Sequence, residues 1–124
     1  IDNVEESLKT AELMKNHFPK VPVYARARNR FHAYKLMDLG IQVIQRDTFL
    51  SSLEMGKKVL EFLGMEEKQV QELSRKFFKY DQDLLLKQHA VYQNEAQLIE
   101  TSKQALADLE SLFESDSQGV EAVK

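Results

Sequence analysis

The first part of the chain alternates between helical and extended hydrophobic spacing. Apolar residues recur at helical intervals between Asn3, which can cap a helix N-terminus, and Pro19, which ends the pattern. Residues 21–27 and 41–45 are short runs of β-branched, aromatic and other apolar residues, and each predicts a strand. Asn29 can cap a second helix between these two strands. The pattern therefore predicts helix–strand–helix–strand.

A third helix is predicted after the second strand. Asp47 or Thr48 can cap it, and Gly64 ends it at a position where helices often adopt a left-handed residue. Gly56 lies inside this helix, where it costs up to about 1 kcal/mol relative to alanine. Its presence predicts that another element packs closely there. The alternation of helices with short apolar strands is typical of an α/β fold with a parallel sheet.

The second part of the chain changes to helical heptads. Apolar or aromatic residues form two stripes at alternating spacings of three and four: Val70, Leu73, Phe77, Tyr80 and Leu84, then Leu98, Ser102, Ala105, Leu109 and Leu112. Polar residues within 88–94 interrupt the stripe, so the sequence predicts one long helix or two helices with a break there. The polar stretch 115–124 predicts a disordered tail. We thus expect three segments, 1–64, 65–114 and 115–124.

Composition limits the classes of function. The chain has 124 residues, 17 Lys and Arg against 20 Asp and Glu, and a net charge of −3, which argues against general nucleic-acid binding. Cysteine is absent, which excludes disulfides and thiolate metal sites, and no apolar run is long enough to span a bilayer. Two parallel strands cannot form a stable sheet alone. Since the chain also starts at Ile1 without methionine, we expect part of a larger domain.

The candidate ligand site is a group of arginines where strands give way to helices. Arg26 and Arg28 alternate with alanines at the end of the first strand, and Arg46 ends the second. Such junctions are where open α/β sheets bind anions. Arg26 and Arg28 can either face a ligand crevice or form a structural ion pair, and the sequence leaves both roles open. Asp2 can contact a nucleotide or cap a helix.

The sequence contains no recognisable catalytic constellation. The three histidines lack the spacing of metal ligands, so we predict no metal site, and no nucleophile–histidine–acid order or carboxylate pair is evident. No stretch matches G-x-G-x-x-G, the phosphate loop of dinucleotide-binding folds. The residues therefore favour a ligand-binding module over an enzyme.

Several motifs in this order resemble those of one family. The segments IDN, NHFPKVPVYARARNRFHAYKLMDLG, QRDTF and LGM resemble the regulatory domain of the glutathione-gated potassium efflux (Kef) antiporters of Gram-negative bacteria. The resemblance implies the C-terminal half of a Rossmann-like, doubly wound parallel sheet followed by long helices. It places residues 1–3 at the end of the fourth strand of that sheet. The family's glycine-rich loop belongs to the other half.

The resemblance also implies a regulatory mechanism and its site residues. Glutathione binds at Arg46 of the QRDTF element, with Thr48 beside it and Asp81 on the next helix, where many relatives carry asparagine. Asp2, Arg26 and Arg28 belong to a nucleotide or interface region, and the complete domain takes AMP or NAD(H).

The implied partners are a second copy bound through the C-terminal helices, a transmembrane antiporter domain of the same polypeptide and a flavodoxin-like ancillary subunit. This places the soluble segment at the cytoplasmic face of the bacterial inner membrane. Two alternatives remain at this point: a fragment of a Rossmann-type oxidoreductase, and a helical dimerisation module with no ligand.

Overall fold

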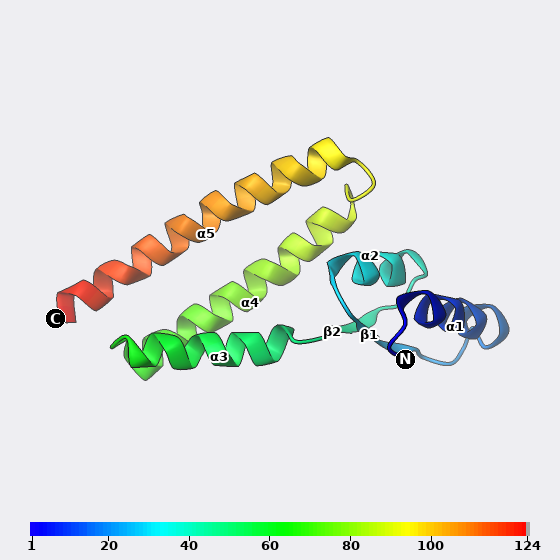
Figure 1. The fold of residues 1–124 in the computed structure, drawn as a ribbon, viewed down its shortest axis with the longest axis horizontal. Coiled ribbons are helices and arrows are strands. Elements are labelled where there is room, and N and C mark those ends of the chain that lie inside the picture. Colours follow the sequence, from blue (N-terminus) through cyan, green and yellow to red (C-terminus); the bar gives the residue numbers. More distant parts are fainter. Residues whose placement is uncertain (124) are drawn as a thin grey trace. The chain divides into compact units, whose positions relative to one another are not determined.

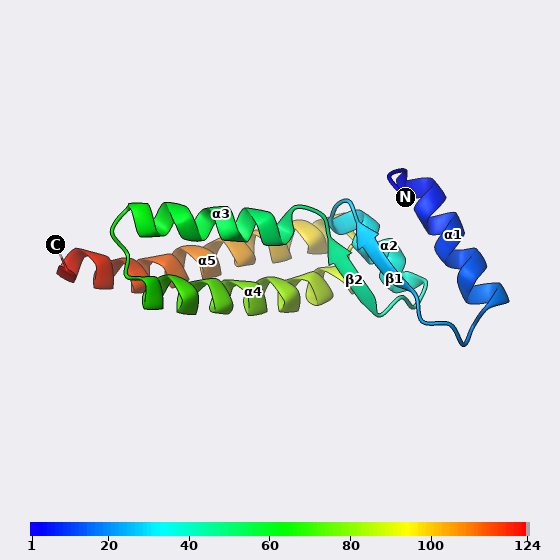
Figure 2. The same cartoon turned by 90° about the horizontal axis from the view of Figure 1, so that it is seen from below.

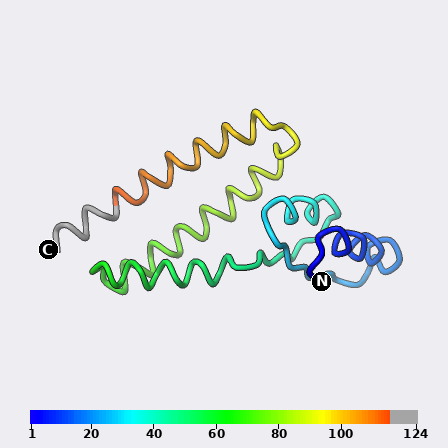
Figure 3. Tube along the Cα trace, viewed as in Figure 1, coloured from blue at the N-terminus to red at the C-terminus, as the bar shows by residue number. Residues whose placement is uncertain are grey.

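The computed structural model describes the backbone of residues 1–123 and the side chains of residues 1–115. The chain divides into two compact units, Ile1–Leu50 and Ser51–Lys124, which are described separately below. Figure 3 shows the path of the chain through each unit. The predicted disordered tail, 115–124, falls almost wholly on residues whose side chains are outside the described part, so it stays a prediction. The predicted boundary between residues 64 and 65, which separates the Rossmann-like part from the helical extension, also stays a prediction.

The first unit is a βαβ arrangement preceded by a helix. Its elements are α1 (Val4–His17), β1 (Tyr24–Ala27), α2 (Arg30–Asp38) and β2 (Val43–Arg46). β1 and β2 pair in parallel, with Tyr24 opposite Val43 and Ala27 opposite Arg46, and Figure 2 shows the two arrows side by side. The helix–strand–helix–strand order and the parallel pairing predicted from the sequence are confirmed.

Two asparagines cap the helices of this unit as predicted. The Asn3 side chain accepts a hydrogen bond from the Glu6 N–H at 3.0 Å, and Asn29 accepts one from the His32 N–H at 2.8 Å. Each bond satisfies a backbone donor that the helix itself leaves unpaired. Gly40 follows α2 with φ 81°, a left-handed value that favours glycine. The caps therefore fix where α1 begins and where α2 begins and ends.

The core of the first unit lies around α2. Five of its seven buried residues are on or beside that helix: His32, Ala33, Tyr34, Leu36 and Ile41. Ala11 of α1 and Ala27 of β1 complete this core, and small side chains there let the elements approach closely. The carboxyl ends of both strands are consequently held against the N-terminus of α2.

The second unit is helical. It contains most of α3 (Phe49–Phe62), then α4 (Glu67–His89) and α5 (Glu95–Val123). The break predicted within 88–94 is confirmed, since α4 and α5 are separate helices that run antiparallel, side by side (Figure 1). Leu85 and Gln88 of α4 and Ala105 of α5 are buried, and the Gln88 amide donates to the Ser102 hydroxyl of α5 at 3.1 Å.

Helix α3 differs from the others because none of its residues is buried. A Cβ placed on Gly56 would have no neighbour within 4 Å, so the close packing predicted at Gly56 is wrong for the described residues. The side chains of Met55 and Phe62 are 63% and 89% exposed. A link to α4 comes from Lys57, whose ammonium donates to the Gln71 amide oxygen at 3.3 Å. In the described part of the chain, α3 thus has a half-buried side that includes Leu53 and Leu60, and it exposes other large apolar side chains.

Candidate ligand site at the strand ends

The two strands end together, and this brings the predicted arginines to one edge of the sheet. Arg26 is opposite Gln45 and Ala27 is opposite Arg46 in the parallel register. The Asp47 N–H donates to the Ala27 carbonyl at 2.7 Å, which continues the pairing one residue past β2. The carboxyl ends of parallel strands are where α/β sheets bind ligands. The structure therefore places Arg26, Arg28 and Arg46 at the chemically expected edge.

Arg26 forms the structural ion pair that was one of its two predicted readings. Its Nε donates to Asp47 Oδ1 at 2.8 Å, although 75% of the arginine side chain is exposed. The hydrogen bond that Arg26 donates to Asp47, and the negative charge of that carboxylate, raise the pKa of Arg26, so the guanidinium stays charged. The pair crosses from β1 to the residue after β2, and it fixes the guanidinium beside the ends of both strands.

Arg28 is anchored to the start of the chain. Its Nη1 donates to the Asp2 carbonyl oxygen, and the two atoms are 2.6 Å apart. Asn3, not Asp2, caps α1, so the capping role predicted as one option for Asp2 is wrong. Asp2 instead offers its backbone to Arg28. The structure thus brings the Asp2 backbone to the arginine edge, and its proposed contact with a nucleotide stays a prediction.

Arg46 and Thr48 lie in the turn that leads from β2 into α3. The Arg46 Cζ atom lies 4.1 Å from the centroid of the Phe49 ring, within the range of a cation–π contact. Thr48 has φ 65°, an uncommon left-handed value for a β-branched residue. This turn directs the chain so that Phe49 comes under the guanidinium. Arg46 is therefore oriented by an aromatic ring that the sequence reading did not connect with it.

Sequence reasoning also missed the role of His32. This ring is 1% exposed, and it contacts the Arg28 backbone and the Ser7 hydroxyl. The sequence contained a signal for this buried role. His32 follows the cap residue Asn29 by three positions, so it lies in the first turn of the predicted helix, and its two sequence neighbours, Phe31 and Ala33, are apolar. The reading tested the histidines only for metal spacing. Among the described residues no group of three His, Asp or Glu side chains could hold a metal ion.

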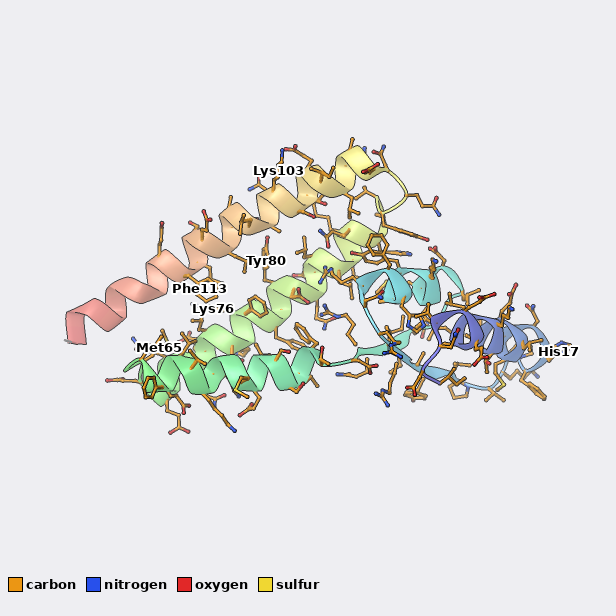
Figure 4. All side chains as sticks on the ribbon, in the orientation of Figure 1. His17, Met65, Lys76, Tyr80, Lys103 and Phe113 are labelled. Carbon is orange, nitrogen blue, oxygen red and sulfur yellow. The ribbon has the colours of Figure 1, made fainter. Side chains whose placement is uncertain are left out.

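Asp81 belongs to α4 in the second unit and is half-buried. Beside it, the Tyr80 hydroxyl donates to Asp108 Oδ2 of α5 at 2.9 Å, and Tyr80 lies between the two helices in Figure 4. Burial, and then the hydrogen bond to Asp108, raise the pKa of Tyr80. Asp81 is thus next to a polar link between α4 and α5 within the second unit.

The first unit also has a cavity of about 300 Å³ at the opposite, amino end of its strands. Lys15, Lys20 and Tyr24 are among the residues that line it. The arginines are not part of this lining. In the described residues, no helix combines the length and apolar character needed to cross a membrane.

Comparison with known proteins identifies the family. A family model described as the potassium efflux system KefB C-terminal domain matches residues 51–122, more than half of the chain. The chain belongs to this family. A solved structure titled Shewanella denitrificans Kef CTD in AMP bound form is 31% identical, with a TM-score of 0.71. The match covers 73% of this chain and 58% of that one, so the chain spans less than two thirds of its relative's length.

The Kef comparison confirms two predictions made from the sequence. The resemblance to Kef regulatory domains, first noted from four short motifs, is confirmed by the family match. The helix-rich α/β fold with a small parallel sheet is confirmed by the structural match. The Shewanella denitrificans domain is in an AMP-bound form in that structure.

Proposed function

We propose that this Kef-family chain is part of a regulatory domain that senses glutathione or its adducts and controls a potassium efflux antiporter. The family match carries this proposal, because the matched family is the C-terminal domain of a potassium efflux system. The arginine edge supplies a plausible chemistry for an anionic ligand. The role is ligand sensing, not catalysis.

Arg46 is the residue that we assign to glutathione. Its Cζ atom lies over the Phe49 ring, which holds the charged group at the end of β2, and an arginine can bind a carboxylate through two parallel N–H groups. Thr48, two residues on, lies in the same turn and can offer its hydroxyl. Asp81 of α4 is the third proposed contact.

Arg26 and Arg28 have a different proposed role. Arg26 donates a hydrogen bond to Asp47 Oδ1, and Arg28 donates one to the Asp2 carbonyl oxygen. We therefore assign these two arginines to the wall of the ligand crevice and not to direct ligand contact. An AMP-bound relative supports nucleotide binding in the complete domain, with AMP favoured over NAD(H). Asp2 is the residue of this chain that we place nearest the nucleotide.

A second copy of the chain is the proposed partner of the helical unit. On α5, Ile99, Leu106 and Phe113 are spaced by seven residues and are 49%, 61% and 44% exposed. Phe62 of α3 is a further large apolar side chain exposed in this unit, at 89%, and exposed apolar side chains of this kind are typical of protein–protein interfaces. Burial of this surface between two copies provides an association energy that grows with the apolar area removed from water.

Gating then follows as a shift between two dimer arrangements. A ligand changes such an equilibrium only by the difference in its affinity for the two states. Glutathione would favour one arrangement and a bulkier adduct the other. The proposed context is the cytoplasmic face of the bacterial inner membrane, with a transmembrane antiporter domain in the same polypeptide and a flavodoxin-like ancillary subunit.

Calorimetry on the complete domain tests the assignment of Arg46. Glutathione binding is expected to weaken at least about tenfold in Arg46→Ala, since charge-assisted hydrogen bonds contribute roughly 1.5–3 kcal/mol. Arg75→Ala, which removes an exposed arginine from α4, is the matched control and should bind like the unaltered protein. AMP binding measured in parallel shows whether each variant is folded. Equal glutathione affinity in all three proteins would reject the site.

A further inference from the structure

The imidazole of His32 joins three segments of the first unit. Its Nδ1 accepts a hydrogen bond from the Arg28 backbone N–H at 2.9 Å, and its Nε2 lies 3.1 Å from the Ser7 hydroxyl on α1. The backbone N–H of His32 is held by Asn29. The ring therefore connects α1 to the junction between β1 and α2.

These contacts select one protonation state. Because the Arg28 N–H can only donate, Nδ1 must be an acceptor, which leaves the proton of a neutral ring on Nε2. Nε2–H then donates to the Ser7 oxygen. A second proton could bind only at Nδ1, where it would face the Arg28 N–H. Protonation and the Arg28 hydrogen bond are thus mutually exclusive.

The surroundings of the ring also favour the neutral form. Burial lowers the pKa of His32 from its ordinary value near 6.5. The negative charge of Asp47, after β2, raises the pKa of His32, while the positive charges of Arg28 and of Lys35 on α2 lower it further. The residue of α1 that contacts the ring is Ser7, which is uncharged. The ring also lies in the first turn of α2, where the helix dipole disfavours a cation.

The same hydrogen bonds, together with the chain between Asp2 and Ser7, form a closed ring of contacts that includes Arg28. The backbone of Arg28 is held by His32, its side chain holds the Asp2 carbonyl, and Asp2 leads into α1, which carries Ser7 back to the imidazole. Opening this ring of contacts at Nδ1 releases the backbone that positions the Arg28 guanidinium. A single proton therefore acts on both the α1 contact and the arginine edge.

We propose that His32 is an acid-released latch, which holds α1 against the β1–α2 junction when neutral and frees Arg28 when protonated. The latch is a property of this unit alone, and it does not depend on which ligand the domain binds. It gives the arginine edge a sensitivity to acid in addition to its response to ligands.

The sign of the effect follows from the lowered pKa. The unfolded chain binds a proton to this histidine near pH 6.5, before the folded chain does. The stabilising contribution of His32 is complete above pH 6.5 and decreases as the pH falls toward the folded-state pKa. Below that value both states are protonated and no further loss occurs.

Nitrogen-15 NMR of the purified ¹⁵N-labelled domain tests the latch between pH 8 and pH 5. Two-bond correlations of the imidazole should show the proton on Nε2 at pH 8. On acidification Nδ1 should gain a proton below pH 6.5, and the Arg28 amide resonance should move with the same midpoint. Protection of that amide from hydrogen exchange should fall about tenfold once exchange is corrected for pH, the size expected for one lost hydrogen bond.

Two variants separate the latch from a general response to acid. In His32→Asn the side-chain oxygen can accept the Arg28 N–H in place of Nδ1 but does not titrate, so the pH dependence of the Arg28 amide should disappear. His17→Asn removes the exposed histidine at the C-terminal end of α1, labelled in Figure 4, and should leave that dependence unchanged.

Three outcomes would overturn the proposal. They are a proton on Nδ1 at pH 8, an Arg28 amide that does not change between pH 8 and pH 5, and a His32→Asn protein with the unaltered pH profile. The first two are measured on the unaltered protein, so they decide the matter even if the variant does not fold.

Discussion

The two units of this chain differ in the side chains that characterise them: hydrogen-bonded polar groups in one and exposed apolar groups in the other. In the α/β unit, a buried histidine and two arginines have hydrogen-bond partners within the unit, and the core packs around α2. In the helical unit, large apolar side chains such as Phe62 and Leu106 remain exposed, and α3 buries none of its residues. Both units have internal hydrogen bonds and exposed apolar side chains, but the charged edge is held within the first unit and the apolar stripe along α5 belongs to the second.

This difference separates two tasks of a sensing domain. Hydrogen bonds to buried groups have strict geometry, so they hold a charged edge in the orientation that ligand recognition needs. Apolar surface has no such directionality, and two helical faces can pack in more than one way at similar cost. In the proposed function, the ligand-binding edge and the dimer interface therefore belong to different parts of the same chain.

The strongest test of the comparison replaces one leucine in each unit. Leu36 is fully buried, and Leu36→Ala is expected to lower the free energy of unfolding by about 2–5 kcal/mol through lost burial and a cavity. Leu106 is 61% exposed, and Leu106→Ala should change monomer stability by no more than about 0.5 kcal/mol while weakening self-association. Urea unfolding followed by circular dichroism and analytical ultracentrifugation measure the two effects.

Equal losses of stability in dilute, monomeric protein would contradict this contrast, because they would mean that Leu106 is buried within a single chain. Unchanged self-association in Leu106→Ala would remove α5 from the proposed interface and leave α3 as the surface to examine.

A smaller effect is expected from the helix caps. Asn29 caps α2 at a partly buried bond, and Asn94 caps α5 at an exposed one, with its Oδ1 3.1 Å from the Gln97 nitrogen. Asn29→Ala should cost about 1 kcal/mol or more, and Asn94→Ala about half of that, since water can replace an exposed cap. Thermal unfolding of the two variants checks the order, and a greater cost for Asn94→Ala would reverse the comparison.

The smallest effect is expected from surface ion pairs. Asp47→Asn weakens the exposed pair with Arg26, and Glu54→Gln weakens the pair with Lys57 on α3, whose atoms are 3.0 Å apart. Both melting temperatures should change less than those of the cap variants, and the changes should shrink in 1 M NaCl because salt screens exposed charges. A large, salt-independent effect of Asp47→Asn would show that this carboxylate supports more than its ion pair.

The fold was more predictable than the site. Asn3, Asn29, Gly40 and the break near residue 90 act locally, through caps and left-handed turns, so the sequence alone placed the elements. The partners of the arginines depend on strand register, which sets Asp47 beside Arg26 across the sheet. The packing predicted at Gly56 was wrong because the cost of a glycine inside a helix does not show whether another element packs against it.

The sheet of the first unit has a practical consequence for handling the protein. Among the described residues it has two strands, so each strand turns one backbone edge away from its partner. Such edges pair readily with other extended chains, and Tyr24 and Val43 add exposed apolar side chains there. Self-association through these edges is therefore expected to increase as the protein concentration rises, which light scattering over a dilution series measures.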